Sequence, residues 1–209
     1  MIHTTVGKLI ALFLGAALAG SAGCGRSQPS RFYTLTSQKS SNATFGSAPA
    51  YQGAIVAIGP VTIPRYLDRP QMVTRSDRNE VRFAETERWA GSLAEDVSRV
   101  LIENLSMLLA GDNVVVLRWD QAVLSSVPTK FRVGVEVLGF EGAVGGTVDF
   151  RARYTIHDMD GKALSVKEST VQERASGPDY DALAAAMSRT LASASREIAD
   201  VVRVKGTGN

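Results

Sequence analysis

Strict alternation of apolar and polar residues marks the second half of the chain. Every second residue is apolar over residues 131–137 and again over residues 148–156. A period of two predicts strands that bury one face and leave the other wet. Residues 142–146 are rich in glycine and residues 158–162 have the composition of a turn, so both favour tight connections. With a polar strand expected over residues 163–174, the pattern predicts a three-stranded antiparallel meander.

Shorter apolar runs in the first half also predict strands. Residues 54–58 are almost all apolar and end at Gly59-Pro60, which indicates a strand buried on both faces. Pro60, Pro64 and Pro70 then predict an irregular or edge segment. Further strands are expected over residues 31–36, over residues 114–119, and in a hairpin whose arms are residues 71–75 and 80–83.

Two stretches have the three-to-four spacing of amphipathic helices. The first stripe of apolar residues runs from Trp89 to Leu108, and Gly111 beyond it fits a helix stop. The second follows the turn-like residues 176–179 and runs from Tyr180 to Val201. Both are long enough to cover a sheet.

This order of elements predicts an α/β fold. We expect a two-layer sandwich, in which two main helices pack on one face of a mixed, mostly antiparallel sheet. Residues 53–209 would form the globular domain, together with the strand at residues 31–36. Residues 37–52 have no periodicity and favour a flexible loop.

The N-terminus has the three parts of a secretory signal peptide, expected over residues 1–23. Its apolar run, residues 9–19, is shorter than the roughly 20 residues that span a bilayer. Small residues then lead to Cys24, and the spacing resembles the lipobox of bacterial lipoproteins, with cleavage between Gly23 and Cys24. Ser21 stands where that pattern usually has leucine, which favours slower processing.

Cys24 is the only cysteine, so the chain can form no internal disulfide. A lone cysteine can also be a small buried hydrophobe, but its place after the signal-like segment favours acylation. Residues 24–52 would then hold the lipidated cysteine, a tether, the first strand and the loop. Gly25 is not the acidic residue that retains many lipoproteins in the inner membrane. The resemblance therefore implies the periplasmic face of the outer membrane.

The charges of the expected mature chain nearly balance. Lys8 is the only charged side chain in residues 1–23, so 22 of 23 basic and all 21 acidic side chains remain. Phosphate backbones bind clustered positive charge, so this balance argues against a nucleic-acid partner.

No catalytic or metal site is predicted. His157 is the only histidine left after signal removal, and we interpret it as a solvated residue on the polar face of its strand. With Cys24 acylated, neither a Cys/His dyad nor a histidine-rich zinc site is supported. Residues 158–162 lack the later ligands of a calcium loop. We expect no enzyme activity, and no cofactor other than the acyl and diacylglycerol groups on Cys24.

Residues 54–109 resemble the ABC-type transport auxiliary lipoprotein family, of which PqiC is the best-known type. The resemblance rests on Phe32-Tyr33-Thr34-Leu35, Ala54 to Val61, Pro64 to Arg75, and Arg88-Trp89-Ala90. It implies an outer-membrane lipoprotein without chemistry of its own. Its implied partners are a periplasmic mammalian-cell-entry (MCE) protein, PqiB-like, and the associated membrane transporter. Homo-oligomerisation stays open, as does the choice between an ABC-driven and a Pqi-type system.

The family segment also suggests where a partner would bind. We take the stiff, partly apolar loop around the prolines as the candidate partner-binding site, with the residues Tyr66, Leu67, Asp68, Arg69, Pro70 and Trp89. The alternative is that this loop caps the core, with Trp89 packed beneath it.

Two further functional classes remain open. In one, the domain is a lipid carrier that holds acyl chains itself, in a groove between helix and sheet. In the other it is a periplasmic enzyme, which the single histidine disfavours. The favoured class is an accessory component that docks a lipid-transport protein and supports envelope integrity.

Overall fold

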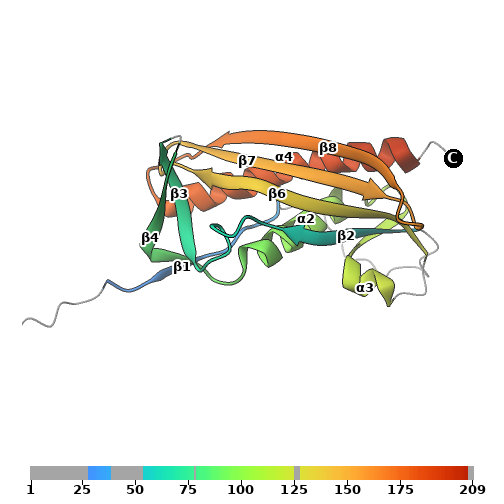
Figure 1. Cartoon of the computed structure of the whole chain (residues 1–209), viewed down its shortest axis with the longest axis horizontal. Helices are drawn as coiled ribbons and strands as arrows, with labels where there is room; N and C mark the ends of the chain where they lie inside the picture. The colour runs from blue at the N-terminus through green and yellow to red at the C-terminus, as the bar shows by residue number, and fades with distance from the viewer. Residues whose placement is uncertain (1–27, 39–53, 78, 125–127, 207–209) are drawn as a thin grey trace, which may run out of the picture.

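One eight-stranded mixed sheet extends along the molecule, and two long helices cover one of its faces (Figure 1). The computed structural model describes residues 28–38, 54–77, 79–124 and 128–206. The strands are β1 (Arg31–Tyr33), β2 (Ala54–Thr62), β3 (Gln71–Asp77), β4 (Glu80–Trp89), β5 (Val114–Arg118), β6 (Thr129–Gly142), β7 (Thr147–His157) and β8 (Ala163–Arg174). The helices are α2 (Leu93–Leu108), α3 (Trp119–Val123) and α4 (Tyr180–Gly206). The predicted α/β sandwich is confirmed.

The sheet combines a long antiparallel part with shorter parallel pairings. Strands β6, β7 and β8 pair antiparallel over most of their lengths, which confirms the predicted meander. Strand β2 runs parallel to both β5 and β6, and β1 runs parallel to β4. The β3–β4 hairpin is also confirmed. It joins the main sheet through a single bridge, Thr74 to Gly142.

The meander follows from its alternating sequence. Val133, Val135 and Val137 point into the core from β6, while Arg132 and Glu136 between them face outward. The turn before β8 forms as predicted, because Asp158 Oδ1 accepts hydrogen bonds from the backbone N–H groups of residues 160 and 162.

Helix α2 begins four residues later than the apolar stripe predicted. Trp89 is the last residue of β4, where its N–H donates to the carbonyl of Pro70 at 2.7 Å. Ser92 has extended backbone angles, and its Oγ accepts from Glu95 N at 3.5 Å, so it caps the helix. The spacing of apolar residues does not show that Trp89 lies before the helix, because Trp89 and the apolar residues of α2 are buried in the same core.

Strand β2 is buried on both faces, as predicted. Val56 and Ile58 belong to the main core, whereas Ile55 and Ala57 pack on the other side against Ala122. The short helix α3 covers this second face of β2, and no sequence pattern predicted it. The strand expected over residues 114–119 ends at Arg118, and Trp119 already begins this helix.

The remaining differences lie at element ends. The first strand stops at Tyr33 rather than residue 36, and β2 continues through the cis peptide Gly59–Pro60 to Thr62. Helix α4 is 27 residues long and packs against α2, β7 and β8. Among the described residues, no helix combines the length and apolar character that crossing a membrane requires.

Candidate functional site

The predicted anchor lies outside the described residues. This applies to the signal peptide at 1–23, to the cleavage site at Gly23 and Cys24, and to most of the loop predicted at 37–52. The described residues begin with Gln28 in the predicted tether, and residues 28–30 are exposed and have no regular structure.

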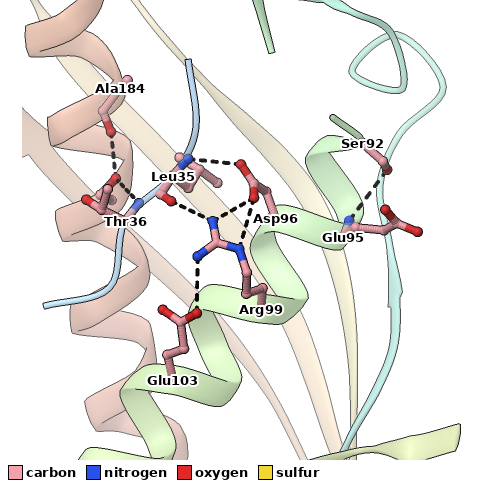
Figure 2. Close-up of polar contacts among 9 residues, drawn as sticks. Leu35, Thr36, Ser92, Glu95, Asp96, Arg99, Glu103 and Ala184 are labelled. Atoms are coloured by element: carbon pink, nitrogen blue, oxygen red, sulfur yellow. Dashed lines mark hydrogen bonds and ion pairs between the residues drawn. The ribbon is translucent and has the colours of Figure 1, made fainter. Parts of the chain in front are cut away.

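Residues 34–38, which follow β1, form a strap bound between α2 and α4. Leu35 N donates to Asp96 Oδ2 at 2.9 Å, and Thr36 N donates to Ser188 Oγ at 3.0 Å (Figure 2). Gln38 N donates to Asn104 Oδ1 at 3.0 Å. Side chains of both helices thus satisfy backbone groups that no strand pairs.

Arg99 binds the strap through a backbone carbonyl group. Its Nη2 donates to the carbonyl of Leu35 at 2.7 Å and to Asp96 Oδ1 at 2.6 Å (Figure 2). Its Nη1 lies 3.2 Å from Glu103 Oε1. The Leu35 side chain is buried beside these groups. The strap is therefore held by charge-assisted hydrogen bonds around a buried apolar residue.

The predicted partner-binding residues divide into a buried and an exposed set. Leu67 and Trp89 lie in the core, at 1% and 4% exposure. Their side chains are therefore out of reach of a binding partner. Asp68 and Pro70 are exposed, and Tyr66 and Arg69 are half-buried. The structure thus contains the core-capping arrangement that the sequence left as an alternative, with an exposed rim.

A buried carboxylate fixes this loop to the sheet. Glu141 of β6 is 2% exposed and accepts a hydrogen bond from the Tyr66 hydroxyl at 2.9 Å. It also pairs with Arg75 of β3 and accepts from Phe140 N at 2.7 Å. Burial, together with the hydrogen bond to Glu141, raises the pKa of Tyr66 to about 12. Sequence reasoning missed Glu141, because no local pattern marks a glutamate whose partners are 66 and 75 residues away.

The outer rim of the loop consists of charged and aromatic groups. Tight turns expose Arg65 and Asp68, whose N–H donates to the Arg65 carbonyl at 3.3 Å. The Arg69 guanidinium lies 3.7 Å from the ring centroid of Phe83, which is 44% exposed. Such cation–π stacking orders a long side chain at the surface. We call Arg65, Asp68, Arg69 and Phe83 the loop rim.

A groove of about 760 Å³ separates α2 from α3. Ile58, Pro60 and Trp119 give it apolar walls, and Arg99 and Asp120 are among its charged lining residues. The sequence did not predict its position, since it arises where the missed helix α3 faces the start of α2.

The described residues contain no cluster of metal-binding side chains. Among them, no group of three histidine, cysteine or acidic side chains is placed to hold a metal ion. His157 lies on the outer face of the sheet as predicted, but it is half-buried rather than fully solvated. Its Nδ1 is inaccessible and has no hydrogen-bond partner among the described residues.

Among the solved structures that resemble this fold are two with TM-scores above 0.6. One is an uncharacterised protein with 20% identity and a TM-score of 0.66, covering 84% of this chain and 99% of its own. The other is a Xanthomonas campestris protein of the DUF330 family, with 16% identity and a TM-score of 0.64, covering 84% and 96%. At these identities the likeness concerns the fold alone. A comparison with curated proteins gave no significant match.

Family membership rests on the sequence itself. Residues 33–199 match the family model described as the ABC-type transport auxiliary lipoprotein component. The match begins within β1 and ends in α4, so it includes the strap, the loop rim and the groove. The chain therefore belongs to the family of ABC-type transport auxiliary lipoprotein components.

Proposed function

We propose that this protein is a lipid-anchored docking component that holds a periplasmic MCE protein at the outer membrane. The observation that carries the proposal is the strap. Chain just beyond the expected anchor is bound into the helix layer by Asp96, Arg99, Asn104 and Ser188. A domain joined so closely to its tether suits a fixed mount at the membrane surface.

The loop rim is the proposed contact for the MCE protein. It lies in the segment that carries the resemblance, and the Glu141 network holds it in place from below. Arginine and aromatic side chains are enriched in protein interfaces, and both are present at this rim. Leu67 and Trp89 act as its buried supports.

A matched pair of charge reversals tests this contact. Arg65→Glu with Asp68→Arg changes the rim but no buried side chain. Asp160→Arg with Lys162→Glu makes the same exchange in the exposed β7–β8 turn. Each lipoprotein would be purified from its native membrane in mild detergent, and MCE proteins would be quantified by mass spectrometry.

The rim variant should lose the MCE protein at least tenfold more than the turn variant, since reversed charges across an interface cost several kcal/mol. Circular dichroism should show both variants folded. Equal recovery with the two variants would refute the rim as the contact. Complete absence of MCE proteins from the unsubstituted sample would refute the docking function itself.

The groove supports a second candidate function, that of a carrier for acyl chains. Its volume falls within the range of small-molecule sites. Against this, charged side chains such as Glu95 and Glu103 line it, whereas an acyl chain requires an apolar surface. Native mass spectrometry separates the two functions: a carrier retains non-covalent phospholipid in addition to its covalent anchor, and a docking component does not.

A further inference from the structure

An exposed phenylalanine stands where the described chain begins. Phe32 of β1 is 64% exposed, while its neighbour Tyr33 is buried. Its cross-strand partner is Arg88 on β4, and the preceding Arg31 has a side chain that is 61% exposed. Phenylalanine beside basic residues is a composition found in protein segments that bind a membrane surface.

The length of chain before this residue limits its distance from the anchor. Arg31 lies seven positions after Cys24, and a fully extended chain spans at most about 3.6 Å per residue, or about 25 Å in all. Phe32 is thus within reach of the bilayer whenever Cys24 is acylated. Residues on the C-terminal side of Phe32 cannot lengthen this connection by detaching from the domain, because residues 35–38 are bonded to α2 and α4.

Helix α4 runs from the β1 end of the domain to the opposite end. The rings of Tyr33 and Tyr180 are 6.5 Å apart, so α4 starts beside β1. Val204 lies 24 residues further along, about 36 Å at 1.5 Å per residue. In Figure 1 the strand β1 and the C-terminus occupy opposite ends of the long axis.

From these placements we infer that the β1 edge of the sheet rests on the membrane, with Phe32 inserted among the lipids and α4 leading away from the surface. The inference rests on the lipid anchor of the proposed function. It goes beyond that function by assigning a second, non-covalent membrane contact. It also leaves the groove and the C-terminal end free on the periplasmic side.

Fluorescence quenching by lipid tests the orientation. The acylated protein would be reconstituted into vesicles of phosphatidylglycerol and phosphatidylcholine brominated on the acyl chains. Phe32→Trp places a fluorophore at the predicted contact, and Val204→Trp places one at the far end, where the side chain is 68% exposed. The unsubstituted protein corrects for Trp89 and Trp119. Ser30→Trp, at an exposed position beside the strand, serves if Phe32→Trp does not fold.

The emission added by Phe32→Trp should shift to the blue and be quenched by brominated lipid, whereas that of Val204→Trp should remain unquenched. Equal quenching at the two positions, or none at position 32 in acylated protein, would overturn the inference and leave the docking function untouched. Intact mass measured on the same sample identifies the other failure: a chain without acyl groups would overturn the anchor on which both proposals depend.

Discussion

Among the described residues, Glu141 is the one acidic or basic residue that is buried. Its side chain is 3% exposed, and it accepts hydrogen bonds from Tyr66, Arg75 and the backbone of Phe140. A buried carboxylate without such partners would cost several kcal/mol. Because the partners come from the loop, from β3 and from β6, a single charge holds three segments in one arrangement.

Tyr66 provides a pH test of this network. Its pKa is about 12 in the folded protein against an ordinary value of 10.0, so the folded state binds this proton more tightly than the unfolded state. Its contribution to stability is complete below pH 10 and is lost between pH 10 and 12. Tyr66→Phe should lower the free energy of unfolding by about 1 kcal/mol at pH 8 through the lost hydrogen bond. It should also make the alkaline decline shallower.

Urea unfolding at pH 8 and at several points between pH 10 and 11.5 measures both effects. Some decline should persist in Tyr66→Phe, because burial also raises the pKa values of Tyr33 and Tyr154 to about 12. Identical slopes in the two proteins would show that the Tyr66 hydroxyl is not held as described.

The contribution of one side chain to the stability of the strap can be measured at Asp96. Asp96→Ala removes the acceptor of Leu35 N and one partner of Arg99, so residues 34–38 should open more readily by about 1–2 kcal/mol. Hydrogen exchange followed by mass spectrometry should then show roughly tenfold faster exchange in the strap. Asp120→Ala is the matched control, since it removes an exposed ion pair with Arg118 and no contact to the strap. Equal exchange in the two variants would mean that Asp96 does not hold the strap.

Two glycines of β6 should respond oppositely to alanine. A Cβ on Gly142 would lie 2.5 Å from the Thr147 carbonyl oxygen and 2.7 Å from Val148 Cα, both backbone atoms. We expect Gly142→Ala to destabilise the protein by about 1–3 kcal/mol. A Cβ on Gly134 meets nothing within 4 Å, so Gly134→Ala should be neutral or stabilise the strand by about 0.5–1 kcal/mol. Thermal unfolding compares the pair, and a larger loss at residue 134 would contradict the register of β6 and β7.

At the scale of the whole molecule, the expected anchor decides location. Cys24→Ser should move the protein from membranes to the soluble periplasmic fraction, because several acyl chains bind a bilayer firmly whereas this domain offers one exposed aromatic contact. Gly25→Asp should keep the anchor and move the protein to the inner membrane, as the sorting pattern implies. Immunoblots of density-separated membranes measure both outcomes. Unchanged outer-membrane recovery of Gly25→Asp would contradict the assignment made from Gly25.

The sequence by itself determined the parts that depend on local spacing. The alternation in β6 and β7, the stripe of α2 and the turn at residues 158–162 were all predicted, because strand and helix periods place apolar residues on one face whatever the rest of the chain does. The motifs around Tyr66 and Trp89 likewise indicated the family, and the match over residues 33–199 confirmed it.

Tertiary structure alone decided which of these residues a partner can reach. Phe32 and Tyr33 are adjacent aromatic residues, yet Phe32 is exposed and Tyr33 is buried, because only the fold brings β1 against β4 and the start of α4. The same holds for Glu141 and for the strap between α2 and α4, as it does for Phe32 on the edge strand β1. Their long-range partners are 56 to 152 positions away, and no periodicity in a single chain records such distances.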